Sequence, residues 1–297
     1  MIQKSLWCYY SVRTYHHTVT KLRSFFLDRG FLEVDSQSPQ HILAACEDPL
    51  TVATYSMSTG SWSLPQTGQM WLEEVLLKNP DLPGVFCHTT SYRDEPTPNP
   101  ERHLRIFPLF EFETHGDMQV LQDLMADMFE YVGFGPQDTY AEGNYKDMAS
   151  RFGVRTLEAK EEMEIGNKLS HIFFLKNFPQ YSHPFFNMKR GDGVAKKIDA
   201  LVYGMETIGS AERSCNADEM WQDFHTISDG GYAQLLFDKF GKERVVAELD
   251  AYLSLNFIPR CGGGIGVNRL MRGIALHQDG QLTQAWNVAT AQSQSQI

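Results

Sequence analysis

Apolar residues recur at helical spacing in two stretches of the chain. In residues 16–28 the apolar side chains share one face, and Gly30 follows at the position expected of a helix C-cap. Residues 117–132 give the clearest pattern, because Asp117 can cap a helix whose apolar stripe consists of Leu121, Leu124, Met125, Met128, Phe129 and Val132. The methionines of this stripe are expected to fill the core rather than to bind a cofactor.

Three further helical stretches are predicted from their boundaries. A turn rich in amide side chains opens a helix over residues 69–78, which an Asn-Pro pair then stops. Residues 156–169 are expected to form a charged helix with a solvated face. Residues 220–253 are predicted to form a helical span with breaks near residues 228–231 and at Gly241.

The connecting stretches carry weaker patterns. Residues 31–34 alternate briefly like a strand, and residues 40–62 are expected to hold loops and short strands. Residues 133–153 are rich in turn formers, and residues 189–197 are expected to form a polar loop.

The stretch from Thr90 to Gly116 is predicted to be a hairpin in which a polar, proline-rich loop joins two strands. Residues 106–113 alternate with a period of two, which is typical of a strand. One face of this strand carries Phe107, Leu109, Glu111 and Glu113, and the other carries Pro108, Phe110 and Phe112.

The polar side chains of this hairpin suit a nucleotide. Arg93 offers a guanidinium for phosphate, and Phe107 offers a ring that can stack on a base. Glu95 lies on the same face as Arg93 and can accept a hydrogen bond from an exocyclic amine. The alternative is a surface hairpin with ordinary cross-strand charge pairs.

Composition narrows the class of protein. The net charge of −11 argues against broad, nonspecific binding of nucleic acid, which needs a positive surface. Five scattered cysteines without a C-x-x-C pair predict reduced thiols and a cytoplasmic location. Neither a signal-like start nor an apolar run of about 18 residues is present, so neither secretion nor membrane insertion is expected.

The run from Ile198 to Arg213 holds a candidate cation site. Asp199 and Glu206 are seven residues apart and would face opposite ways on one straight strand, but Gly204 can supply a turn or bulge that brings them together. Two carboxylates beside ATP phosphates are a usual setting for Mg²⁺. Without further context, a structural salt bridge is the more common use of such a pattern.

A glycine-rich run, residues 262–266, precedes an expected helix that begins near Arg269. Glycines allow the backbone to approach a ligand, and a helix N-terminus favours anions. The spacing matches neither the P-loop nor the dinucleotide-binding fingerprint, so it supports neither kind of site.

Three motifs in this order resemble those of class II aminoacyl-tRNA synthetases, in the aspartyl/asparaginyl branch. The second signature motif corresponds to Arg93, Glu95, His103, Phe107 and Glu111. The helix and strand of residues 16–39 resemble the first motif, which forms the dimer interface in that family. Residues 264–270 resemble the third motif, in a form similar to that of the archaeal asparagine synthetase related to asparaginyl-tRNA synthetase.

The resemblance implies an α+β fold, with an antiparallel sheet flanked by helices. It implies one catalytic domain over residues 1–289, a disordered tail over residues 290–297, and no anticodon-binding barrel. The expected cofactors are ATP and Mg²⁺, and the expected assembly is a homodimer through residues 16–39.

The resemblance also assigns roles to single residues. Arg93 and Arg269 are the implied catalytic residues, and Asp199 and Glu206 the implied metal ligands. ATP would be bound by Arg93, Glu95, His103, Phe107, Glu206 and Arg269. The amino-acid substrate would be bound by Gln69, Trp71 and Arg213.

The implied activity is ATP-dependent formation of an aminoacyl-adenylate, and the sequence leaves the substrate open. Arg213 favours an acidic amino acid, whereas Leu72 replaces the lysine of aspartyl enzymes and Trp71 replaces the histidine of asparaginyl enzymes. The acyl acceptor can be tRNA, ammonia, a small molecule or a protein. Two alternatives stay open: an asparagine synthetase that amidates aspartate with ammonia, and a non-catalytic regulatory paralogue that binds a nucleotide or amino acid.

Overall fold

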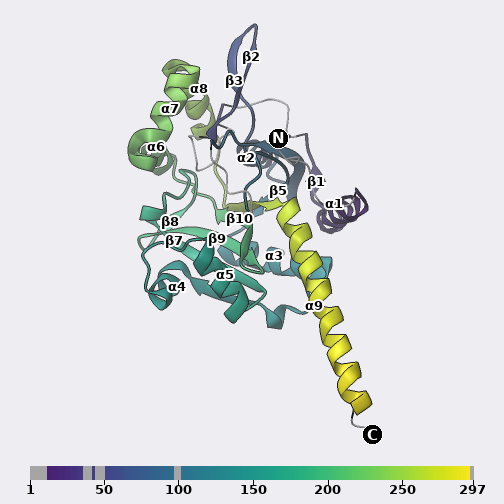
Figure 1. The fold of residues 1–297 in the computed structure, drawn as a ribbon. Helices are drawn as coiled ribbons and strands as arrows, with labels where there is room; N and C mark the ends of the chain where they lie inside the picture. The colour runs from purple at the N-terminus through teal and green to yellow at the C-terminus, as the bar shows by residue number, and fades with distance from the viewer. Residues whose placement is uncertain (1–11, 36–41, 44–50, 97–101, 295–297) are drawn as a thin grey trace, which may run out of the picture.

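The computed structural model describes residues 12–35, 42–43, 51–96 and 102–294, with side chains described through residue 280. Its centre is a nine-stranded sheet with the strand order β1-β4-β5-β11-β10-β9-β7-β6, in which β8 also pairs with β9. The interior pairings are antiparallel, and only the edge pairs β1–β4 and β6–β7 are parallel. The predicted fold class, an antiparallel sheet flanked by helices, is confirmed (Figure 1).

The strands of the large sheet have the following bounds: β1 Leu32–Glu33, β4 Gly84–Tyr92, β5 Ile106–His115, β6 Ala141–Asn144, β7 Ile172–Pro179, β8 Arg190–Gly191, β9 Val194–Val202, β10 Met205–Glu212 and β11 Arg260–Gly266. A separate two-stranded ribbon consists of β2 Thr54–Met57 and β3 Gly60–Ser63, and it projects from the body at the top of Figure 1.

The helices have the following bounds: α1 Val12–Leu27, α2 Gln69–Lys78, α3 Met118–Val132, α4 Tyr145–Phe152, α5 Ala159–Lys168, α6 Ala217–Thr226, α7 Gly231–Phe240, α8 Lys242–Leu253 and α9 Val267–Gln294. Among the described residues, no helix combines the length and the apolar character needed to cross a membrane.

The clearest sequence patterns are confirmed. Asp117 caps α3 by accepting from the backbone N–H groups of Gln119 and Val120, and Gly133 ends the helix in the left-handed conformation. The breaks expected within residues 220–253 separate α6, α7 and α8.

Two local predictions need correction. The turn-rich stretch 133–153 contains β6 and α4, and Tyr145 and Ala149 of α4 are buried against β7. The expected loop 189–197 includes β8 and the first residues of β9. The glycine run forms β11 inside the sheet, and the helix expected after it is α9, which begins at Val267.

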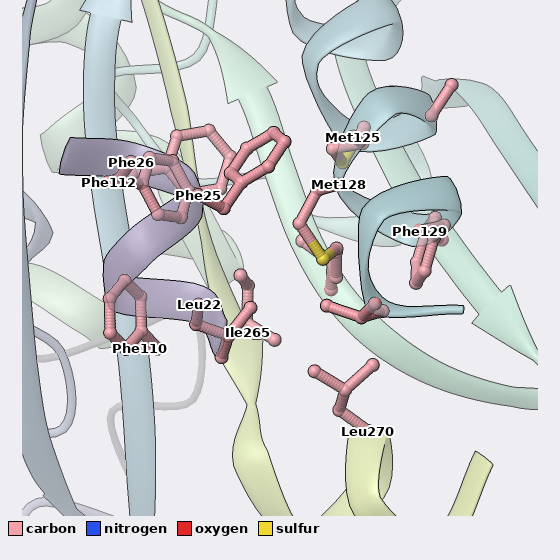
Figure 2. Packing of buried hydrophobic residues seen from close by; sticks show 14 of the residues in the cluster. Leu22, Phe25, Phe26, Phe110, Phe112, Met125, Met128, Phe129, Ile265 and Leu270 are labelled. Carbon is pink, nitrogen blue, oxygen red and sulfur yellow. The ribbon is translucent and has the colours of Figure 1, made fainter. Parts of the chain in front are cut away.

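The main core lies between one face of the sheet and the helices α1, α3 and α9. The predicted alternation in β5 holds, because Phe110 and Phe112 point into this core and pack on Phe26 of α1. Met125 and Met128 of α3 belong to the same core cluster as these rings (Figure 2), so the methionines fill the core as predicted. The opposite face of β5 is therefore turned away from the core and is available for chemistry.

Helices α2 and α5 pack on this opposite face. Leu72 and Leu76 of α2 contact Val85 and Cys87, which alternate with the core-facing residues of β4. On α5, a β-carbon at Gly166 would overlap the backbone of Gly204, so the helix rests directly on the turn between β9 and β10. This contact fixes the turn that separates the two predicted metal ligands.

The ends of the chain leave two predictions open. Helix α9 continues to Gln294 and so includes part of the stretch for which a disordered tail was predicted, residues 290–297. The boundary of the catalytic domain at residue 289 stays a prediction. The predicted dimer interface also stays a prediction, and residues 36–39 of it lie outside the described residues.

Candidate active site

Two buried carboxylates of β5 mark the centre of the candidate active site. Glu111 and Glu113 lie on the face opposite to Phe110 and Phe112, and at most 1% of each glutamate residue is exposed. Charged groups are rarely buried without partners, because the interior solvates them poorly. The partners of these two glutamates come from α2 and from the end of β10.

Two of the residues predicted to hold the amino acid meet at Glu113. The side-chain amide of Gln69 donates to Glu113 Oε2. The guanidinium of Arg213 lies 3.4 Å from Glu113 Oε1 and 3.5 Å from Glu73 Oε1. Burial raises the pKa of Glu113 well above its usual range, although the charge of Arg213 opposes that shift. The structure thus brings Gln69 and Arg213 to one place.

A buried ion network, which no sequence pattern predicted, lies beside Gln69 and Arg213. Glu73 of α2 accepts from Arg260 Nη2 at 2.7 Å and from the hydroxyl of Tyr252 at 2.7 Å. Its other oxygen accepts from the side-chain amide of Asn187 at 2.6 Å. Glu73, Arg260 and Asn187 are each 0% exposed. Glu73 is therefore saturated with donors, and it holds Arg213 in position through their ion pair.

Glu111 is held by the turn that opens α2. The hydroxyl of Thr67 donates to Glu111 Oε1, and the backbone N–H of Gly68 donates to Glu111 Oε2 at 2.8 Å. Burial raises the pKa of Glu111 to about 7, against the hydrogen bonds from Thr67 and Gly68 and the charges of Arg213 and Arg93, which lower it. A ligand ammonium group at this position would favour the ionised form.

The third-motif arginine lies at the other end of the site. Arg269, in the first turn of α9, donates to the backbone oxygen of Glu206 at 2.6 Å, and its Nη1 lies 3.8 Å from Glu206 Oε2. It also donates to the backbone oxygen of Arg102 at 3.4 Å. Arg269 thereby joins the loop of the hairpin to the strand that carries Glu206.

The residues predicted as metal ligands share one face. Glu206 pairs with Leu201 and Ile208 pairs with Ala200, so a register shift turns Glu206 to the same side as Asp199. A β-carbon at Gly209 would lie 3.1 Å from Glu206 Oε1 and 3.8 Å from Asp199 Oδ1. The missing side chain of Gly209 thus leaves space between the two carboxylates.

This donor set fits a hard divalent cation. Carboxylate oxygens are the ligands that Mg²⁺ takes, and it usually keeps several waters beside one or two protein carboxylates. Within the described parts of the chain, no group of three or more histidine, cysteine or acidic side chains could hold a metal ion. A cation at this place would therefore have two protein ligands and would complete its shell with water or phosphate.

The charge of Arg93 acts on both ends of the site. Its charge lowers the pKa of Glu111 and also contributes, after Arg269 and Lys197, to lowering that of Glu206 against the effect of burial. Its guanidinium carbon lies 5.3 Å from the centre of the Phe107 ring. The two hairpin residues proposed for phosphate and base are therefore adjacent.

Three predicted site residues make contacts that differ from their expected roles. Glu95 accepts a hydrogen bond from His103 at 3.0 Å. By resemblance to the family, Glu95 was expected to bind the adenine of ATP and His103 to face its terminal phosphates. Trp71 is two residues beyond Gln69 on α2, so it points to a different side, and its indole donates to the backbone oxygen of Asp35 at 2.6 Å. The binding roles of these residues stay predictions.

Glu111 should make the stability of the ligand-free protein depend on pH. Its pKa is raised to about 7 in the folded state from 4.5. The stabilisation is therefore complete below pH 4.5 and is lost as the pH rises through 7. We expect the free energy of unfolding to fall by about 2 kcal/mol more between pH 5.5 and 8.5 in the wild type than in Glu111→Gln. Urea unfolding at several pH values measures this, and identical pH profiles would contradict it.

The chain is similar to known proteins in both sequence and fold. Residues 10–279 match the family described as tRNA synthetases class II (D, K and N). The chain is 23% identical over 283 residues to an aspartate–tRNA(Asp/Asn) ligase of Methanopyrus kandleri, and the match covers 86% of the chain and 62% of the relative.

Solved structures show the same fold. An asparaginyl-tRNA synthetase from Pyrococcus horikoshii, complexed with asparaginyl-adenylate, superposes with a TM-score of 0.68 at 21% identity, over 87% of the chain and 63% of that structure. An aspartyl-tRNA synthetase from Entamoeba histolytica superposes with a TM-score of 0.66 at 16% identity, over 87% of the chain and 54% of that structure. The chain spans less than two thirds of the length of each of these relatives. Because the matched region covers most of the chain, the protein belongs to the class II tRNA synthetases of the aspartyl, lysyl and asparaginyl group.

Proposed function

We propose that this chain is an ATP-dependent ligase that activates an amino acid as its adenylate. The position of Arg93 carries the proposal, because its charge acts on Glu111 at the amino-acid end and on Glu206 at the metal end. In a reaction of an amino acid with ATP, the α-phosphate must lie between the attacking carboxylate and the departing pyrophosphate. A guanidinium whose charge acts on both ends of the site suits that phosphate.

The proposed step needs no covalent bond to the protein. One carboxylate oxygen of the amino acid attacks the α-phosphorus, the bond from that phosphorus to the bridging oxygen breaks, and pyrophosphate leaves with the electron pair. Arg93 would offset charge on the α-phosphate, and Arg269 would do so on the leaving group. Mg²⁺ bound by Asp199 and Glu206 would supply further positive charge to the phosphates. The protein's part is to position the groups.

The charges at the amino-acid end favour a neutral substrate side chain. Arg213 is already shared by two buried carboxylates, Glu73 and Glu113. A substrate carboxylate would compete with these two groups for the donors of the same guanidinium. A carboxamide can accept from a guanidinium and donate to a carboxylate without adding charge. We therefore propose that asparagine is preferred to aspartate.

The test is ATP–pyrophosphate exchange with each of the twenty amino acids in the presence of Mg²⁺. We expect exchange that depends on one amino acid, with asparagine favoured over aspartate by at least about tenfold, the equivalent of roughly 1.4 kcal/mol. Arg269→Ala should abolish this exchange if the pyrophosphate leaves beside that guanidinium. Exchange with no amino acid would contradict adenylate formation.

Two other functions would differ from the proposed one in what the protein consumes and releases. An asparagine synthetase would consume ATP only with aspartate and ammonia together, and would release asparagine. A regulatory paralogue would bind ATP or an amino acid and catalyse no exchange. The retention of Asp199, Glu206 and Arg269 favours an enzyme, because a binding subunit has no need for metal ligands.

The acyl acceptor, the assembly and the location belong to the proposal as well. The adenylate would be consumed by an acyl acceptor, which can be tRNA, ammonia, a small molecule or a protein. The proposed homodimer would use α1 and β1, where Leu27 and Leu32 are 48% and 49% exposed. The proposed location is the cytoplasm, consistent with Cys87, Cys215 and Cys261 forming no disulfide.

A further inference from the structure

Lys197 lies beside the proposed metal ligands, although it belongs to none of the recognised motifs. It precedes Asp199 by two positions on β9, so the two side chains share a face. Its ammonium nitrogen lies 3.3 Å from Asp199 Oδ2 and 4.5 Å from the centre of the Phe178 ring. Only 12% of the lysine side chain is exposed. An ion pair and an aromatic ring thus hold this ammonium group at the carboxylate pair.

The second carboxylate has a cation of its own. Arg269 Nη1 lies 3.8 Å from Glu206 Oε2 and donates to the backbone oxygen of the same residue. The two carboxylates and the two cations together carry no net charge. A divalent ion that approaches the pair must therefore overcome repulsion from Lys197 and Arg269 at short range, where screening is weak.

A triphosphate can draw both cations away from the carboxylates. Arg269 is expected to meet the terminal phosphates of ATP, as the resemblance of its motif implies. Lys197 has donors that rotate about a flexible stem, so its ammonium group can turn from Asp199 to a phosphate oxygen. Entry of a triphosphate therefore gives both cations new anionic partners and leaves the carboxylates to the metal.

We propose that Lys197 is a built-in counter-ion of Asp199 and Glu206, which keeps the pair from binding a free divalent ion and makes the ion enter with the nucleotide. This inference rests on the proposed function, because it takes a nucleoside triphosphate as the ligand that brings the ion. It goes beyond that function in giving a role to a residue outside the motifs and an order to the binding steps.

The deciding experiment is a titration of the nucleotide-free protein with Mn²⁺, in which the electron paramagnetic resonance signal of the free ion is measured at each step. Lys197→Met keeps an unbranched side chain of similar length beside Phe178 and removes the charge. We expect this variant to bind Mn²⁺ at least about tenfold more tightly than the wild type, because the repulsion is lost. Lys197→Gln should show the same gain in Mn²⁺ affinity. This variant keeps a polar group at the position and provides a second test in case Lys197→Met disturbs the fold.

The adjacent lysine is the matched control. Lys196 lies on the other face of β9, and its ammonium group is 3.9 Å from Asp192, whose side chain is 96% exposed. Lys196→Met removes the same charge one residue away and should leave Mn²⁺ affinity unchanged. Asp199→Asn in the Lys197→Met background should abolish the gain, which assigns the ion to this pair. Equal affinity of the wild type and both Lys197 variants would overturn the proposal, and so would an equal gain in Lys196→Met.

A second titration with a non-hydrolysable ATP analogue separates this inference from the proposed function. The analogue should raise the Mn²⁺ affinity of the wild type and largely remove its difference from Lys197→Met. An analogue without effect on either protein would refute nucleotide binding. In that case the first titration still decides whether Lys197 acts as the counter-ion, because it contains no nucleotide.

Discussion

Arg93→Ala is expected to lower kcat/KM for amino-acid-dependent pyrophosphate exchange by about 10²–10³-fold. The charge of the guanidinium acts on both the amino-acid end and the metal end of the site, and in the proposed reaction negative charge builds up on the α-phosphate between them. A positioned charge acts strongly at such a place because it needs no reorganisation during the reaction. Steady-state exchange at saturating and limiting ATP separates the effect on kcat from that on KM.

The control for this variant is Arg151→Ala. Arg151 is exposed in the last turn of α4, a helix that packs on β6 and β7 at the edge of the sheet. The same loss of charge there should leave exchange near the wild-type rate. A similar loss of rate in both variants would show that Arg93 acts through net charge or stability, and the role at the α-phosphate would be wrong.

Glu73→Ala is expected to lower the free energy of unfolding by about 3–5 kcal/mol. The substitution removes the carboxylate that pairs with Arg260 and Arg213 and accepts from Tyr252, while those groups stay buried. Removing one partner of a buried ion pair is costly because the remaining charge is left without compensation. Urea unfolding at pH 7 measures the change.

The neighbouring residue provides the matched control. Glu74 pairs with Lys78 one turn further along α2, and 57% of that lysine side chain is exposed. Glu74→Ala should cost about 0.5 kcal/mol or less, as is usual for a surface pair on a helix. Comparable losses in the two variants would mean that the helix, and not the buried network, sets the stability.

The sequence predicted the elements whose signals are local. The hairpin face was correct because alternation with a period of two decides which side chains of β5 meet the core. Helix α3 was correct because a capping aspartate, an apolar stripe and a terminal glycine all agree. The parts of the site that lie in motifs, such as Arg269 beside Glu206, were also placed close together by the structure.

The failures have a common physical cause. Short elements such as β6 and α4 are stabilised by tertiary packing rather than by their own pattern. The network at Glu73 joins residues as far apart as Arg260, 187 positions later, so no local spacing indicates it. Lys197 was assigned to a loop, and its approach to Asp199 depends on the strand that this prediction missed.

The role of the glycine run follows from packing that the sequence pattern does not show. In β11 it supplies room: a β-carbon at Gly262 would overlap the carboxylate of Glu113, and one at Gly263 would lie 2.5 Å from the β-carbon of Ser210. Neither glycine has a positive φ, so the run is not a flexible turn. An isolated pattern of glycines does not distinguish space from flexibility.

This strand limits how the protein can be re-engineered. A library that seeks to change the accepted amino acid by varying every position near Glu113 would include Gly262 and Gly263, and most substitutions there would yield unfolded chains. Arg213 is also unsuited to variation, because its removal would break the buried ion pairs with Glu73 and Glu113. A change in the amino acid proposed as substrate is therefore best sought at Gln69, whose side chain reaches Glu113 from α2, with the glycine and Arg213 codons held fixed.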